Sequence, residues 1–160
     1  MLSQQAVSEI QREINKYPPN KKQAALMATL SIAQREIGHL STEVMDWIAG
    51  FLNVPPIRVR EVATFYSMYD LEPVGRHKIC VCSNVSCMLR GSDEVIQHIE
   101  TRLGIKVGET TPNGEMTLTD VECLGACGGA PMMQIDDDYH ENLTSERIDA
   151  ILDQLETTNA

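Results

Sequence analysis

Two pairs of cysteines constrain this chain more than any other feature of its sequence. The first pair, Cys82 and Cys87, lies in CSNVSC, and the second pair, Cys123 and Cys127, lies in CLGAC. Thiolates are soft metal ligands, and four of them on two loops can hold either a tetrahedral zinc ion or the two irons of a 2Fe-2S cluster. A fold that uses all four thiols has to bring the two loops together.

The spacing within each pair separates these possibilities. Zinc ribbons usually use Cys-x2-Cys knuckles, whereas the pairs here are Cys-x4-Cys and Cys-x3-Cys, wider loops that suit a larger inorganic core. The spacing favours an iron-sulfur cluster, with a zinc-stabilised interaction module as the alternative of a different class. A thiol-disulfide oxidoreductase is disfavoured because it needs Cys-x2-Cys at a helix N-terminus. Structural disulfides are disfavoured because no secretory signal is visible, so that a reducing cytoplasm is the expected compartment.

Small residues surround the second pair. Gly125, Gly128 and Gly129 would let the backbone approach closely and point its N-H groups at anionic sulfurs, although tight turns alone also use such glycines. The residues that we expect around the four thiols are Ser83, Gly125, Ala126, Gly128, Gly129 and Pro131. The fifth cysteine, Cys80, is interpreted as a small apolar residue inside a strand rather than as a ligand.

The first part of the chain has the apolar periodicity of helices. Leu26, Leu30, Ala33 and Ile37 form one stripe at helical spacing, a second stripe runs through residues 44–52, and proline pairs separate the helices. Residues 57–69 continue the pattern and predict a fourth long helix. Its aromatic end is either ordinary core or a docking surface for another protein of a complex.

The pattern changes after residues 71–75, where we place a domain boundary. A strand is predicted at 77–82, a helix at 93–103, further strands at 116–122 and 132–135, a short fourth strand after an acidic turn, and a last helix from Ser145. Strands interleaved with helices indicate a small α/β domain. The predicted organisation is a helical bundle over residues 1–74, followed by an α/β domain over residues 75–160.

Charge and missing motifs exclude several functions. The net charge of -10 argues against binding to nucleic acid, which requires a basic surface. No segment reaches the roughly 20 apolar residues of a membrane span, and the longest candidate covers only residues 24–33. The phosphate-binding patterns GxGxxG and GxxxxGK[ST] are missing, so the chain is not expected to bind NADH, FMN or ATP by itself. What remains is a one-electron carrier.

Four segments together resemble a known family. They are ATFYSMY at residues 63–69, VGR at 74–76, CSNVSC at 82–87 and CLGACGGAP at 123–131. The set resembles the family of E-type subunits of NADH-quinone oxidoreductase, respiratory complex I, whose mitochondrial counterpart is flavoprotein 2. The resemblance covers nearly the whole chain. It implies an α+β/α/β architecture, with an N-terminal helical bundle followed by a thioredoxin-like ferredoxin domain that holds one 2Fe-2S cluster. By position, the resemblance implies that the ligands of this cluster are Cys82, Cys87, Cys123 and Cys127.

The resemblance also implies a function and a partner. The cluster would exchange one electron with FMN on the NADH-binding flavoprotein of complex I, and the chain would be enzymatic only as part of that complex. It would belong to a peripheral arm on the cytoplasmic side of the membrane, without inserting into it. The alternative within the same chemistry is a diaphorase component of an NAD-linked hydrogenase or formate dehydrogenase. Residues 65–69 are expected to form part of the interface with the partner protein.

The peptide bond before Pro131 is hypothesised to be cis. The alternative is a trans proline that begins an edge strand.

Overall fold

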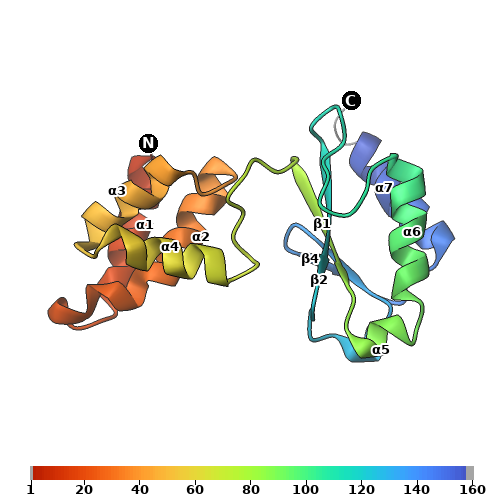
Figure 1. The fold of residues 1–160 in the computed structure, drawn as a ribbon, viewed down its shortest axis with the longest axis horizontal. Coiled ribbons are helices and arrows are strands. Elements are labelled where there is room, and N and C mark those ends of the chain that lie inside the picture. The colour runs from red at the N-terminus through yellow and green to blue at the C-terminus, as the bar shows by residue number, and fades with distance from the viewer. Residues whose placement is uncertain (1, 158–160) are drawn as a thin grey trace. The chain divides into compact units, whose positions relative to one another are not determined.

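The computed structural model describes residues 2–157 and divides the chain into two compact units, Met1–Pro73 and Val74–Ala160. Figure 1 shows helices alone in the first unit, and a sheet with helices in the second. This combination of helices with a small mixed sheet confirms the fold class that the sequence predicts. Each unit has its own hydrophobic core.

The first unit is built from helices whose ends carry clear sequence signals. The hydroxyl groups of Ser3 and Ser41 accept hydrogen bonds from the first turns of two helices, and Gly38 ends another in the left-handed conformation. Pro56 occupies a first-turn position, where its missing N-H costs nothing. The elements are α1 (Gln4–Ile14), η1 (Pro19–Ala25), α2 (Leu26–Ile37), α3 (Thr42–Leu52) and α4 (Pro56–Phe65).

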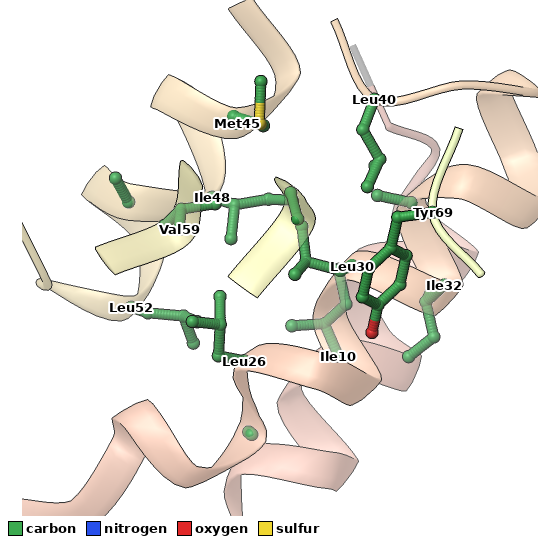
Figure 2. Close-up of a cluster of buried hydrophobic side chains, with 14 of the residues drawn as sticks. Ile10, Leu26, Leu30, Ile32, Leu40, Met45, Ile48, Leu52, Val59 and Tyr69 are labelled. Atoms are coloured by element: carbon green, nitrogen blue, oxygen red, sulfur yellow. The ribbon is translucent and has the colours of Figure 1, made fainter. Parts of the chain in front are cut away.

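Large aliphatic side chains fill the core of this unit. Figure 2 shows Ile10, Leu30 and Ile48, which come from α1, α2 and α3, gathered with Tyr69 in one cluster. All three aliphatic side chains are fully buried. Because apolar burial is the main favourable term in folding, this cluster is what holds the helices together.

The predicted helix over residues 57–69 is too long, because α4 ends at Phe65 and Tyr66 is extended. The chain then folds back onto α2, where the Tyr69 hydroxyl donates to the carbonyl of Met27 at 3.0 Å. The Gln34 side chain binds the backbone on both sides of Tyr69. The aromatic segment is therefore divided, since Tyr69 belongs to the core while Phe65 is 79% exposed.

The second unit contains a four-stranded mixed sheet in the order β2-β1-β3-β4. β1 and β2 are parallel, and the other pairs are antiparallel. All predicted strands are present, including the short fourth one, and an unpredicted helix, α5, lies inside the first cysteine loop. The elements are β1 (His77–Cys82), α5 (Val85–Met88), α6 (Ser92–Leu103), β2 (Met116–Val121), η2 (Cys127–Gly129), β3 (Met133–Ile135), β4 (Asp138–His140) and α7 (Ser145–Thr157).

One face of this sheet is covered by helices. Ile79 and Val81 of β1 are fully buried and pack with Ile99 of α6 and Leu152 of α7. Figure 1 shows α6 and α7 on the same side of the strands. Because side chains alternate along a strand, Cys80 points to the opposite face. The helices thus fix the orientation of β1, which ends at Cys82.

No helix within residues 2–157 could cross a membrane. The longest one there, α7, has 13 residues, whereas a span needs about 20. The apolar segment at residues 24–33 instead contributes Leu26 and Leu30 to the first core.

Candidate metal centre

The two cysteine loops meet because β1 and β2 run parallel. Cys82 is the last residue of β1 and pairs with Val121, the last residue of β2. Carboxyl ends of parallel strands lie at the same edge of a sheet, which is where open α/β sheets usually place their sites. Cys87 follows on α5, and Cys123 follows β2 after one intervening residue. The pairing of β1 with β2 therefore brings the two cysteine loops to the same edge of the sheet, which the cysteine spacing alone could only suggest.

The two pairs differ in exposure. Cys82 and Cys87 are 3% and 1% exposed, and they pack with Ala130 and Met132 in a small apolar cluster. Cys123 and Cys127 are exposed at the surface. All five cysteines of the chain are free in the structure. A group held by the four predicted thiols would be anchored in the interior on one side and accessible on the other.

Electrostatic interactions connect these thiols. Burial raises the pKa of the Cys82 thiol, but hydrogen bonds from the backbone of Asn84 and Leu124 and from the thiols of Cys87 and Cys123 outweigh burial. The net result is a Cys82 pKa below its usual value. This thiol therefore interacts with one sulfur from each pair, and backbone N-H groups from both loops favour its thiolate form.

The pKa of the neighbouring thiol, Cys87, shifts in the opposite direction. Burial, the hydrogen bond with Cys82 and the charge of Cys82 raise the pKa of Cys87 to about 11, although a hydrogen bond from the backbone of Met132 lowers it. The charge of Cys127 raises it further. Adjacent thiols resist ionising together, whereas a bound metal ion deprotonates the thiols that coordinate it. Cys82 and Cys87 of the first loop thus interact with Cys123 and Cys127 of the second, so the two loops lie close together.

The donor set fits an iron-sulfur cluster. Within residues 2–157 no three His, Cys, Asp or Glu side chains form a group that could hold one metal ion. Along the sequence the four cysteines form two pairs, and two pairs would give each of two irons two thiolates. The backbone N-H of Gly125 donates to the Cys123 sulfur at 3.4 Å, in addition to the N-H groups that face Cys82 and Cys87. Such N-H groups stabilise negative charge on sulfur.

The three glycines of the second loop have different reasons to be there. Gly125 has a φ of +77°, a conformation that side chains rarely adopt. A Cβ at Gly129 would overlap the side chain of Glu141. A Cβ at Gly128 would meet no atom of the chain within 4 Å, so close approach of the backbone to a bound cluster stays a prediction for both Gly128 and Gly129.

The other residues expected around the thiols lie on the same loops. The Ser83 hydroxyl donates to the carbonyl of Val121 at 3.2 Å and so ties the first loop to β2. Ala126 packs against the buried cluster that contains Cys82 and Cys87. The bond between Ala130 and Pro131 is cis, which confirms that hypothesis.

Cys80 is placed apart from the loops, in the middle of β1. Its partners across the sheet are Thr119 and Gln134. The Thr119 hydroxyl lies 3.3 Å from its sulfur, and the side chain is partly buried. This position agrees with its interpretation as a strand residue.

Sequence reasoning missed the segment that supports the second loop from outside. The Tyr139 hydroxyl donates to the carbonyl of Leu124 at 2.8 Å. Farther along, Asn142 N-H donates to the carbonyl of Gly129 at 2.6 Å, and the N-H of the next residue donates to the carbonyl of Pro131. No local signal could have indicated these contacts, because residues 138–143 look like an ordinary strand and turn next to acidic residues.

Comparison with known proteins assigns the family. Residues 10–156 match the family described as thioredoxin-like [2Fe-2S] ferredoxin. The chain is 50% identical over 145 residues to an E-type NADH-quinone oxidoreductase subunit of Rhizobium meliloti, covering 91% of this chain and 85% of that protein. It is 43% identical over 155 residues to the mitochondrial NADH dehydrogenase [ubiquinone] flavoprotein 2 of Dictyostelium discoideum, covering 96% of this chain and 63% of that protein.

A solved structure shows the same fold at low identity. The NAD+-reducing [NiFe]-hydrogenase in the air-oxidized state superposes with a TM-score of 0.70 at 20% identity, over 81% of this chain and 23% of that one. At this identity the likeness concerns the fold alone. The family match, by contrast, favours iron-sulfur over zinc for the four-thiol site. The family match and the similarity to these relatives show that the chain belongs to the thioredoxin-like [2Fe-2S] ferredoxin family and, within it, to the E-type subunits of NADH-quinone oxidoreductases.

Proposed function

We propose that this chain is the electron-transfer subunit of the NADH dehydrogenase module of an NADH-quinone oxidoreductase. The observation that carries the proposal is the meeting of two cysteine loops at one sheet edge, in a chain half identical to an E-type subunit of such an enzyme. The chain is enzymatic as part of that oxidoreductase. By itself it is an electron carrier.

The ligands that we propose are Cys82, Cys87, Cys123 and Cys127, and the group that they hold is one 2Fe-2S cluster. Such a cluster supplies a one-electron couple when it is bound. The chain contributes two buried thiolates as an anchor, two exposed thiolates as a point of access, and backbone N-H groups that stabilise added negative charge.

The proposed partner is a flavoprotein that binds FMN and NADH. A nicotinamide delivers two electrons as a hydride, so a flavin is needed to divide them before a one-electron carrier can accept one. The exposed pair, Cys123 and Cys127, supports electron exchange at a surface that a partner could cover. We further propose that residues 75–160 form the ferredoxin domain, that residues 1–74 serve assembly, and that the complex places the chain in a peripheral arm on the cytoplasmic side.

Metal analysis tests the cofactor directly. The full chain would be purified without oxygen and assayed for iron, acid-labile sulfide and zinc, followed by EPR of the dithionite-reduced sample. About two irons and two sulfides per chain with a rhombic S = 1/2 signal are expected. One zinc ion without sulfide, in a chain that also fails reconstitution with iron and sulfide, would overturn the proposal.

Copurification tests the partner. A tagged chain expressed in its own organism is expected to recover a flavoprotein that contains FMN, together with further oxidoreductase subunits, and NADH should reduce the cluster in that complex. Recovery of a hydrogenase or formate dehydrogenase would instead support the diaphorase alternative. That outcome would leave the cluster chemistry intact and overturn the assignment to NADH-quinone oxidoreductase.

A further inference from the structure

A tyrosine outside the cysteine loops is connected to one of the proposed ligands through a single peptide group. The hydroxyl of Tyr139, on β4, donates to the carbonyl oxygen of Leu124 at 2.8 Å. That carbonyl and the N-H of Gly125 belong to the same peptide group. The Gly125 N-H donates to the Cys123 sulfur at 3.4 Å. The contacts form a continuous path from the phenol to the sulfur.

Peptide geometry makes the two ends of this path interdependent. A trans peptide group is planar, so its C=O and N-H point in opposite directions and rotate together. A hydrogen bond that fixes the carbonyl of Leu124 therefore also fixes the direction of the Gly125 N-H. Hydrogen bonds in a chain polarise one another, so the same contact strengthens this N-H as a donor to the Cys123 sulfur.

Leu124 packs against the buried cysteine cluster, so the remaining freedom of this peptide lies on its Gly125 side. Gly125 is exposed, has a φ of +77°, and a Cβ there would meet nothing within 4 Å. Glycine is free to adopt many backbone conformations, so the peptide before it can turn away from the sulfur at low cost. Tyr139, in contrast, is held in a strand, where it pairs with Gln134 of β3.

We propose that Tyr139 is a positioning residue for the iron-sulfur site, because it orients the Gly125 N-H toward the Cys123 sulfur and so raises the reduction potential. The inference rests on the proposed function, in which Cys123 is a ligand. An N-H that points at a ligand sulfur stabilises the reduced, more negative form of a cluster. Without the phenol hydroxyl, that form loses part of its stabilisation.

The test is Tyr139→Phe in the full chain, which retains the ring and removes only the donor. At a fixed ambient potential the ratio of reduced to oxidised cluster should fall about three-fold to ten-fold, which corresponds to roughly 30 to 60 mV for a one-electron couple. Iron and sulfide content should not change. The matched control is Tyr66→Phe, which removes a phenol hydroxyl from the other unit and should leave the potential unaltered. An unchanged potential in Tyr139→Phe with full iron content would overturn the proposal.

A second measurement does not depend on the cluster. In the metal-free chain, NMR should show faster hydrogen exchange for the Gly125 amide in Tyr139→Phe than in the wild type, because the peptide turns more freely. The amides of β1 should exchange at the same rate in both. Equal exchange at Gly125 would refute the orienting role. Absence of iron from the wild type would instead refute the proposed function, so the two failures are distinguishable.

Discussion

The two units differ in charge far more than in size. Met1–Pro73 carries seven Lys and Arg against eight Asp and Glu, a net charge of -1, whereas Val74–Ala160 carries six against fifteen, a net charge of -9. All five cysteines lie in the second unit. The nearly neutral unit has an apolar core and exposed aromatic side chains, and the acidic unit contains the four thiols that we propose as ligands. Stability and redox function should therefore be separable by mutation.

The largest expected effect is the loss of the cluster on Cys123→Ala. Removal of one of four thiolates should eliminate stable iron binding, measured as iron and sulfide per chain. Because Cys123 is exposed, the first unit should keep its stability, which the single tryptophan, Trp47, reports by fluorescence during urea unfolding.

The matched control for this prediction is Cys80→Ala, which should bind iron normally. If Cys80→Ala lost the cluster and Cys123→Ala retained it, the ligand assignment would be wrong.

Leu30→Ala should lower the stability of the first unit and leave the cluster bound. The side chain is fully buried in the first core, and such a truncation typically costs about 3 to 5 kcal/mol. The urea midpoint followed through Trp47, which stacks on Phe51 in the same unit, should fall accordingly. Cluster absorbance should persist in urea that unfolds the first unit.

Met27→Ala is the control on the same helix, since its side chain is exposed, and it should change the midpoint little. Simultaneous loss of cluster absorbance and native Trp47 fluorescence in Leu30→Ala would contradict the separation of the two units.

Charge substitutions should show which unit docks on the proposed flavoprotein partner. Phe65 is 79% exposed at the end of α4, and Phe65→Glu is expected to weaken assembly about ten-fold or more, as substitutions of aromatic interface residues do. The measurement is retention of the flavoprotein by a tagged chain over a titration of its concentration.

Leu89→Glu is the comparison in the second unit, because Leu89 is 76% exposed beside the first cysteine loop. Normal assembly of Phe65→Glu with failure of Leu89→Glu would move the interface from the aromatic segment to the cysteine loops.

The smallest effect should come from Glu100→Gln on α6. A hydrogen bond from Lys106, followed by one from the backbone of Val107, holds the pKa of Glu100 below its usual value. A lowered folded-state pKa contributes stability above the unfolded-state pKa, and that stability disappears as the pH falls through the folded value. The melting temperature of Glu100→Gln should therefore be slightly lower than that of the wild type at neutral pH. In acid, the two melting temperatures should be equal.

Lys106→Gln should reproduce this loss, and the double variant should add little to it. A difference between Glu100→Gln and the wild type that grows as the pH falls would contradict the assignment.

Local patterns predicted much of the architecture. The stripe through Leu26 and Leu30 indicated α2, and the alternation through Ile79 and Val81 indicated β1 with its correct end at Cys82. Prediction failed at residues 66–69, because the helical periodicity continues through Tyr69 while a tertiary contact with Met27 ends the helix earlier. The four thiols were visible from spacing, whereas their neighbour Tyr139 was not.

By itself, the sequence determined most of the helices, the strands, the cysteine pairs and the family, because periodicity and spacing are properties of residues near one another in the chain. Only the tertiary structure decided that Cys82 and Cys123 share an edge, that one pair is buried and the other exposed, and that Tyr139 reaches Leu124. These contacts join residues far apart in the sequence. Strand pairing and core packing place them, and no local pattern encodes either one.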